Sequence, residues 1–113
     1  MPFIRTEVNL PIPPEKKKSI VRQFGQAISL LPGKSESYLM LSFQENASLF
    51  FAGSDAPAAI CEVKVFGPLS SSACSNLTAA LTECLCSELG LPAGRVYVAY
   101  FSTGEWGWNG SSL

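Results

Sequence analysis

The sequence predicts an α+β domain in which two consecutive strand–helix–strand units share one four-stranded mixed sheet. Four short apolar segments have the length and composition of strands, and apolar residues at helical spacing follow the first and the third of them. The two helix-to-strand junctions also match, because Leu31-Pro32-x-Lys34 has a counterpart in Leu91-Pro92-x-x-Arg95. These observations indicate a pseudo-repeat of about 55 residues, and 113 residues fit a single domain, residues 1–113.

The first unit starts with residues 3–10, a short alternating run that suits a strand. Three prolines within residues 11–14 then break the chain, and Pro14 or Glu15 suits the first turn of a helix. Six apolar residues at helical spacing predict the helix itself: Ile20, Val21, Phe24, Ala27, Ile28 and Leu31. Pro32-Gly33 ends it, and residues 38–43 (YLMLSF) are predicted to form a buried strand.

The second unit repeats this plan. Residues 58–66 (AAICEVKVF) are predicted to form a strand that ends at Gly67-Pro68, and the serines at 70–72 offer oxygens for an N-cap. Seven residues form the next helical stripe: Ala73, Leu77, Ala80, Leu81, Cys84, Leu85 and Leu89. Residues 95–101 (RVYVAYF) complete the unit as its second strand.

Both helices are expected on the same face of the sheet, because the crossover in each strand–helix–strand unit is right-handed. The other face then has no cover from this chain. Three of the predicted strands are apolar at nearly every position, which is typical of strands with two covered faces. We therefore expect an obligate oligomer in which the sheets of different copies face one another.

The composition argues against several classes of protein. Of the residues, 47% are hydrophobic and 15% charged, the net charge is -1 and histidine is absent. The one basic cluster, residues 16–18, is interpreted as the solvated start of a helix, so a nucleic-acid partner is not expected. No segment is apolar and long enough for membrane insertion, and no secretory signal is recognisable, which favours a cytoplasmic location or secretion without a signal peptide.

The four cysteines are Cys61, Cys74, Cys84 and Cys86. Their spacing matches neither a C-x-x-C pair nor a zinc site, and there is no histidine to complete one. They are interpreted as small buried apolar residues, so no metal and no disulfide are expected.

A proline stands directly behind the initiator methionine. Removal of Met1 would turn Pro2 into a free secondary amine, which can exchange a proton near neutral pH, whereas an internal proline only constrains the backbone. This position alone predicts little, because a small residue is common there.

Five segments in the same order resemble the macrophage migration inhibitory factor and D-dopachrome tautomerase family. They are MPFIRTEVNLP, GKSESYLML, FFAGSDAPAAICEVKVFG, GRVYVAYF and WGWNGSSL, and together they cover essentially the whole chain. The resemblance implies a homotrimer whose sheets form a central barrel. It also implies a cofactor-independent keto–enol tautomerase of the phenylpyruvate or dopachrome type, acting on a small aromatic keto acid or its enol.

The resemblance assigns Pro2, freed by removal of Met1, as the general base. It places a further set of residues around the substrate: Lys34, Lys64, Val65, Phe66, Tyr97, Trp106 and Trp108. Lys34 would bind the substrate oxygen and lower the pKa of the amine, the backbone N–H near Phe66 would bind the same oxygen, and Tyr97 would come from the neighbouring subunit. Without the resemblance, Lys34 would only favour the dipole of the preceding helix, Lys64 would be a surface residue, and the three aromatic residues after it would be core.

Three departures from the family pattern concern specificity. Val65-Phe66 replaces the usual Ser-Ile, Ala99 replaces an asparagine, and only Cys61 remains of a C-x-x-C motif, so no redox activity through that motif is expected. A second function follows equally from the resemblance, namely an extracellular, cytokine-like signalling or binding protein that recognises a receptor through the same surface. A third alternative is an inactive member in which Met1 is retained and Pro2 is an ordinary amide.

Overall fold

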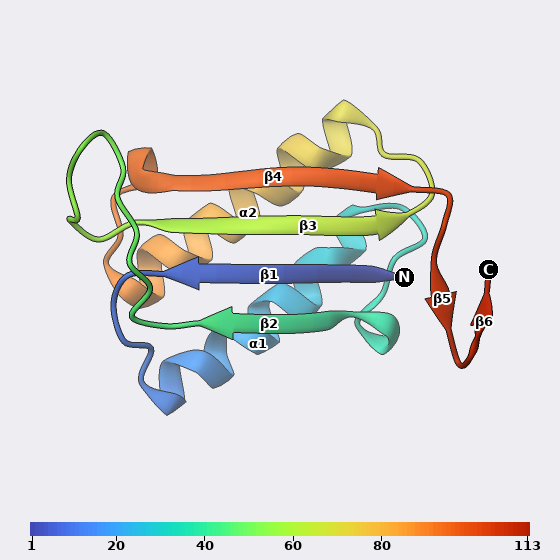
Figure 1. Cartoon of the computed structure of the whole chain (residues 1–113), viewed down its shortest axis with the longest axis horizontal. Helices are drawn as coiled ribbons and strands as arrows, with labels where there is room; N and C mark the ends of the chain where they lie inside the picture. Colours follow the sequence, from blue (N-terminus) through green and yellow to red (C-terminus); the bar gives the residue numbers. More distant parts are fainter.

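The computed structural model describes all residues from 1 to 113 and shows one four-stranded sheet with two helices behind it (Figure 1). The main elements are β1 (Pro2–Val8), α1 (Pro14–Ala27), β2 (Met40–Gln44), β3 (Ala59–Phe66), α2 (Ser71–Leu89) and β4 (Val96–Thr103). Short 3₁₀ turns are η1 (Ile28–Leu30), η2 (Glu36–Tyr38) and η3 (Ala93–Arg95), and a terminal hairpin contains β5 (Gly107–Trp108) and β6 (Ser111–Ser112). The predicted fold class is confirmed.

The strand order is β2-β1-β3-β4, with parallel pairs β1–β2 and β3–β4 joined by an antiparallel pair β1–β3 in the centre. Each parallel pair is one strand–helix–strand unit, because parallel neighbours need a long crossover, which α1 and α2 provide. The antiparallel centre relates the two units by a local twofold arrangement, in which Arg5 of β1 lies directly opposite Glu62 of β3. The sheet is therefore mixed, as predicted.

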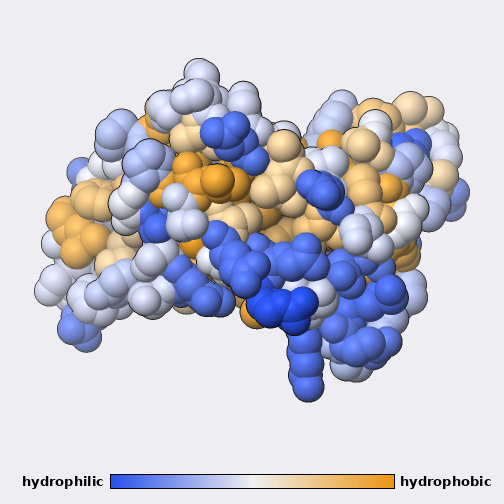
Figure 2. Space-filling view, turned by 180° about the vertical axis from the view of Figure 1, so that it is seen from behind, coloured by the Kyte–Doolittle hydropathy of each residue, from blue (hydrophilic) through white to orange (hydrophobic).

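The core lies between the sheet and the two helices. Alternate strand residues such as Ile4, Val63 and Val65 are fully buried there against Phe24 of α1 and Leu81 of α2. The outer faces of the helices are polar, and hydrophilic side chains gather over the lower half of Figure 2, where α1 lies. No helix in the chain combines the length and hydropathy that a bilayer crossing requires.

The uncovered face of the sheet is less apolar than the sequence predicted. β3 alternates strictly, so that Ala59, Cys61, Val63 and Val65 face the helices and the residues between them face away. Those residues include Glu62 and Lys64, and Glu62 forms an ion pair with Arg5. The expectation that this strand is apolar on both faces was wrong, because its two charged residues occupy the same side.

Other parts of the uncovered face do expose large apolar side chains. Met40 at the start of β2 is 67% exposed, and Tyr97 and Phe101 of β4 are also exposed. An oligomer would therefore cover a mixed surface with apolar side chains near its edges.

The strand predicted at residues 38–43 begins later, at Met40. β2 pairs with β1 from Phe3↔Met40 onward, and since β1 begins at Pro2, no strand lies opposite Tyr38. Tyr38 instead ends the turn η2. The helix α1 also ends earlier than expected, at Ala27, and continues as the single 3₁₀ turn η1. This change agrees with the preference of Leu31, which precedes a proline, for an extended backbone.

Two local signals predicted by the sequence are present. Pro14 occupies the first turn of α1. Ser70 is the N-cap of α2, where its hydroxyl accepts a hydrogen bond from the Ala73 N–H at 3.2 Å. The first helix has no side-chain cap, so the two units begin their helices differently.

Candidate active site

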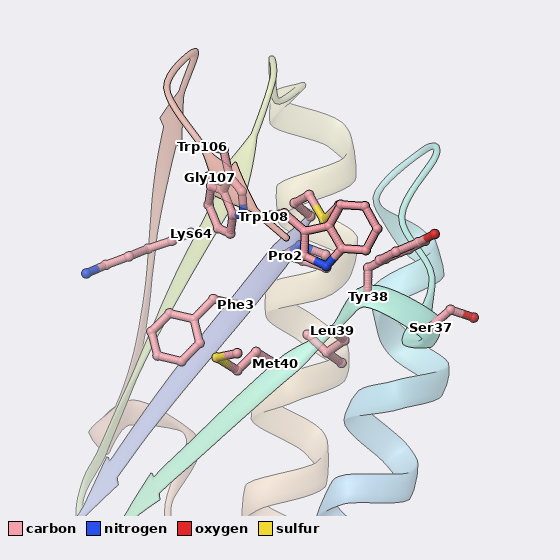
Figure 3. Close-up of a pocket in the computed structure, with 11 residues that line it drawn as sticks. Pro2, Phe3, Ser37, Tyr38, Leu39, Met40, Lys64, Trp106, Gly107 and Trp108 are labelled. Atoms are coloured by element: carbon pink, nitrogen blue, oxygen red, sulfur yellow. The ribbon is translucent and has the colours of Figure 1, made fainter. Parts of the chain in front are cut away.

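A pocket of about 640 Å³ opens at the end of the sheet where β1 begins (Figure 3). Its walls come from four parts of the chain: the start of β1, the turn η2 with the start of β2, the end of β3, and the terminal hairpin. The lining residues are Met1, Pro2, Phe3, Ser37, Tyr38, Leu39, Met40, Lys64, Trp106, Gly107 and Trp108. Most of them are apolar or aromatic, which suits a flat, apolar ligand.

Tyr38 and Trp108 form one aromatic wall. Their ring centroids are 5.8 Å apart with an interplanar angle of 88°, an edge-to-face contact. Figure 3 shows the Trp108 ring beside Pro2 and the Tyr38 ring on the far side of Trp108. Each ring is about half exposed, so its free surface is available to a ligand.

The terminal hairpin presents both indoles to the pocket. Asn109 and Gly110 have φ values of 53° and 78°, which identify the tight hairpin turn that an Asn-Gly pair favours. The Leu113 N–H closes the hairpin by donating to the Trp106 carbonyl at 2.8 Å. The hairpin therefore sets the positions of Trp106 and Trp108 together.

Lys34 and Phe66 meet beside this pocket. The ammonium of Lys34 donates to the Phe66 carbonyl at 2.7 Å, and the Phe66 N–H donates to the Met1 carbonyl at 3.1 Å. A hydrogen bond from the Lys34 N–H to the Leu31 carbonyl at 3.0 Å forms the turn after η1, from which the side chain extends. The end of β3, Lys34 and the start of the chain are thus joined by hydrogen bonds.

Lys34 and Phe66 line a second, adjoining cavity of about 380 Å³ rather than the first. The other walls of this cavity are mostly apolar and come from the segments before β2 and before α2. The Lys34–Phe66 hydrogen bond therefore belongs to the wall of the second cavity, and the Phe66 N–H joins it to Met1, which lines the first.

An amine at this end of β1 is electrostatically disfavoured in its charged form. Burial, followed by the positive charge and the hydrogen bond of Lys34, lowers the pKa of the Met1 amine below its usual value. Pro2 is more deeply buried than Met1. A proton acceptor at this place would therefore be in its neutral, basic form at a lower pH than an ordinary terminal amine.

The remaining predicted residues, Lys64, Val65 and Tyr97, lie in three different environments. The stem of Lys64 lines the pocket, but its ammonium lies 5.9 Å from the centre of the Phe101 ring and points away from Pro2 in Figure 3. Val65 pairs with Pro2 across the sheet, and its side chain is fully buried toward the helices. Val65 therefore lines neither cavity.

Tyr97 lies at the opposite end of the sheet. Pro2 pairs with Val65, whose neighbour on β4 is Ser102, five residues beyond Tyr97. Five strand residues span roughly 16 Å. The structure therefore brings Pro2, Trp106 and Trp108 into one pocket and places Lys34 and Phe66 in a second cavity that a hydrogen bond joins to Met1, whereas Tyr97 lies apart from both.

Sequence reasoning missed part of the lining. Phe3, Ser37, Tyr38, Leu39, Met40 and Gly107 all contribute to the pocket. Their signal was obscured because the apolar run YLMLSF was interpreted as one buried strand, whereas its first two residues lie before the strand. The register of β2 on β1 decides this boundary, and the local sequence does not reveal it.

The cysteines are free and lie outside the pocket. Cys61 and Cys84 are buried, whereas Cys74 and Cys86 are partly exposed. Burial raises the pKa of the Cys61 thiol to about 11 and that of Cys84 to about 12. No group of three or more histidine, cysteine, aspartate or glutamate side chains is arranged to hold a metal ion.

The whole chain is similar to known proteins of one family. The family model for macrophage migration inhibitory factor matches residues 1–113. Macrophage migration inhibitory factor from Xenopus laevis is 29% identical over 83 residues, which is 72% of each chain, and the Brugia malayi homolog is 24% identical over 115 residues, 100% of this chain and 99% of its own. The crystal structure of Leishmania major MIF2 is 33% identical with a TM-score of 0.93, covering 100% of this chain and 97% of its own.

Proposed function

Because the chain belongs to the macrophage migration inhibitory factor family over its whole length, we propose that it is a cofactor-independent keto–enol tautomerase with Pro2 as the general base. The observation that carries this proposal is the meeting of the Lys34 ammonium, the Phe66 N–H and the start of β1 at one end of the sheet. The substrate is a small aromatic α-keto acid or its enol, of which phenylpyruvate is the simplest representative.

The base is the secondary amine that Pro2 carries after removal of Met1. The lowered pKa of the Met1 amine supports this role, because burial and Lys34 act on any amine at this point. The Pro2 nitrogen then remains unprotonated to a lower pH than an ordinary terminal amine. It takes a proton from the carbon next to the substrate carbonyl, and its ring keeps the lone pair in a fixed direction.

The negative charge that develops on the substrate oxygen needs hydrogen-bond donors. In the unprocessed chain the Phe66 N–H donates to the Met1 carbonyl, so removal of Met1 leaves this donor free for a substrate oxygen in the same place. The Lys34 ammonium has three N–H groups and uses one on the Phe66 carbonyl. The other two are available to the oxygen or to the carboxylate.

The reaction conserves all atoms. Pro2 removes the carbon-bound proton, the electron pair forms the enolate, and the proton is returned to the oxygen, which converts the keto acid to its enol. The reverse order converts the enol to the keto acid. The aromatic ring of the substrate packs against Tyr38, Trp106 and Trp108, which keep water from it.

The proposed assembly is a homotrimer whose sheets surround a central barrel. The exposed side chains of Met40, Tyr97 and Phe101 support an assembly that covers the open face of the sheet. In this arrangement Tyr97 of one subunit completes the pocket of the next.

A steady-state assay with phenylpyruvate tests the proposal. Intact-mass measurement first establishes that Met1 is absent, and kcat/KM is then compared between the wild-type protein and Pro2→Gly. We expect a loss on the order of 10²-fold or more, because a positioned base contributes about 10² to 10⁴-fold. Equal thermal melting of the two proteins is the control for folding.

Two results would contradict the proposal. Complete retention of Met1 on the native protein excludes the amine mechanism, and unchanged kcat/KM in Pro2→Gly excludes Pro2 as the base. A correctly processed wild-type protein without any turnover would favour the signalling or binding alternative.

A further inference from the structure

The loop between β2 and β3, residues 45–58, presents an aromatic residue to the uncovered face of the sheet. Its tip is a tight turn in which Phe51 and Ser54 exchange two backbone hydrogen bonds of 2.9 and 3.0 Å. Ala52 and Gly53 between them both have positive φ, at 53° and 75°. Such turns hold their flanking residues in a defined direction.

Arg95, which directly precedes β4, fastens this tip at the same end of the sheet, because β3 and β4 are parallel neighbours. Its guanidinium donates to four backbone carbonyls of the loop, those of Phe51, Ser54, Ala56 and Pro57, at 3.0–3.2 Å. This uses four of its five N–H groups. Only the planar fork of an arginine can reach four carbonyls in this way, since a lysine ammonium has three donors on one atom.

The same guanidinium lies against the Phe51 ring, with its carbon 5.2 Å from the ring centre. The Phe51 ring in turn meets the Tyr97 ring edge-on, with centroids 5.1 Å apart and an interplanar angle of 89°. Tyr97 is nevertheless 58% exposed. We call these three residues the Arg95–Phe51–Tyr97 stack.

We propose that Arg95 and Phe51 are positioning residues that fix the ring of Tyr97 for the pocket of a neighbouring subunit. This inference rests on the proposed function, in which Tyr97 completes that pocket. An exposed tyrosine without Phe51 beside it would sample several rotamers and lose them on binding substrate, whereas a ring already held by the stack loses little.

The expected kinetic effect follows from the fact that the base and Tyr97 belong to different subunits. Pro2 and Lys34 lie on one chain and Tyr97 on the other, so a looser Tyr97 weakens substrate binding without altering the base. Disrupting the stack should therefore raise KM, while kcat and the pH at which activity falls stay close to those of the wild type.

Two variants disrupt the stack and one provides a matched control. Arg95→Lys keeps the charge but loses the fork, and Phe51→Leu keeps an apolar side chain but loses the ring. Asn9→Ala is the control, because Asn9 holds the same loop through the carbonyls of Leu49, Asp55 and Ala56 and the N–H of Ala58, none of them in the stack.

The first measurement is kinetic, with phenylpyruvate as the probe. We expect Arg95→Lys and Phe51→Leu to raise KM about three- to tenfold with kcat and the pH profile unchanged, and Asn9→Ala to lower the melting temperature with KM unchanged. Unchanged KM in both stack variants would overturn the inference, because the stack would then have no effect on substrate binding. An equal rise of KM in Asn9→Ala would also overturn it, because any disturbance of the loop would then weaken binding.

The second measurement does not depend on activity. In protein labelled with 3-fluorotyrosine, the ¹⁹F signal of Tyr97, assigned by its loss in Tyr97→Phe, should shift in both stack variants and stay in place in Asn9→Ala. A signal that does not move contradicts the stack itself. Absence of turnover in a processed wild type, by contrast, contradicts the proposed function, so the two failures are distinguishable.

Discussion

The two strand–helix–strand units each carry one basic residue between the helix and the outer strand, and the two residues have opposite surroundings. Lys34 precedes β2, donates through its ammonium to a single backbone carbonyl, that of Phe66, and lines the second cavity. Arg95 precedes β4 and donates to four carbonyls of one loop. At the same position of the repeat, the basic residue of the first unit thus keeps side-chain N–H donors free, whereas that of the second unit uses nearly all of its donors.

The segments that face these residues account for the difference. Arg95 lies beside the loop of residues 45–58, which leads directly into β3 and supplies carbonyls in a tight turn. Lys34 lies beside the start of β1 and the end of β3, where the Phe66 carbonyl accepts its hydrogen bond. One end of the sheet is therefore closed by backbone, and the other end holds a pocket bounded by side chains. The repeat supplies the scaffold, and the connecting segments decide what each end can do.

Of the two basic residues, Lys34 should cause the larger change in activity when it is replaced. Lys34→Gln removes a charged donor from the substrate oxygen, and since hydrogen bonds to charged groups are worth about 1.5–3 kcal/mol, kcat/KM for phenylpyruvate should fall roughly 100-fold. Lys18→Gln is the control, because it removes the same charge from an exposed position of α1. A loss in Lys34→Gln no greater than in Lys18→Gln would remove Lys34 from the site.

The pH dependence of the same variant tests the electrostatic part of the comparison. The charge of Lys34 contributes to lowering the pKa of an amine at the start of β1, so its removal raises that pKa. The base acts in its unprotonated form. Activity in Lys34→Gln should therefore begin to fall at a higher pH than in the wild type as the solution is made more acidic, in a plot of kcat/KM against pH. If the activity of Lys34→Gln fell at the same pH as that of the wild type, burial alone would set the pKa of the amine.

Arg95 should matter more for stability than Lys34. Arg95→Gln loses most of the hydrogen bonds to the loop, and we expect the free energy of unfolding to fall by about 2 kcal/mol. Lys34→Gln loses a single hydrogen bond and should cost less than Arg95→Gln. Urea unfolding of both variants checks whether Arg95 contributes more to stability than Lys34 does. Equal destabilisation would mean that the two basic residues contribute equally to the free energy of unfolding, whatever their number of hydrogen bonds.

The halves also differ in their alkaline stability, because all four cysteines lie in the second unit. Burial raises the pKa of Cys61 from 9.0 to about 11, so the folded state keeps the thiol protonated while the unfolded chain ionises. The stabilisation is complete below pH 9 and is lost between pH 9 and about 11. One pH unit is worth about 1.4 kcal/mol. Urea unfolding at pH 9 and pH 10 should therefore show a loss of stability that is about 1 kcal/mol smaller in Cys61→Ala than in the wild type, and the part that remains comes from thiols such as Cys84, whose pKa is also raised.

The sequence predicted the arrangement of the elements because their signals are local. The stripe from Ile20 to Leu31 and the caps at Pro14 and Ser70 depend on neighbouring residues only, and the structure contains both helices. The charged residues of β3 could also have been used, since Glu62 and Lys64 alternate with buried residues in the sequence itself. The error at residues 38–43 is different, because the start of β2 depends on where β1 begins.

The candidate site was predictable only in part. Pro2 and Lys34 have no distinctive local pattern, and the family resemblance was needed to single them out. Tyr38 and Met40 were missed because their place in the pocket depends on the register of β2. The role of Arg95 was missed for another reason: its partners are backbone carbonyls, which carry no sequence signature.

The smallest expected effect concerns the start of the two helices. Ser70 caps α2 with its hydroxyl, whereas α1 begins at Pro13-Pro14 without a side-chain cap. Ser70→Ala should therefore lower the free energy of unfolding by about 1 kcal/mol, since the Ala73 N–H loses its acceptor. Ser71→Ala is the matched control, because it changes the adjacent serine without removing the cap. An equal cost for both serines would mean that the hydroxyl at position 70 contributes nothing specific, and that α2, like α1, is held in place mainly by packing against the sheet.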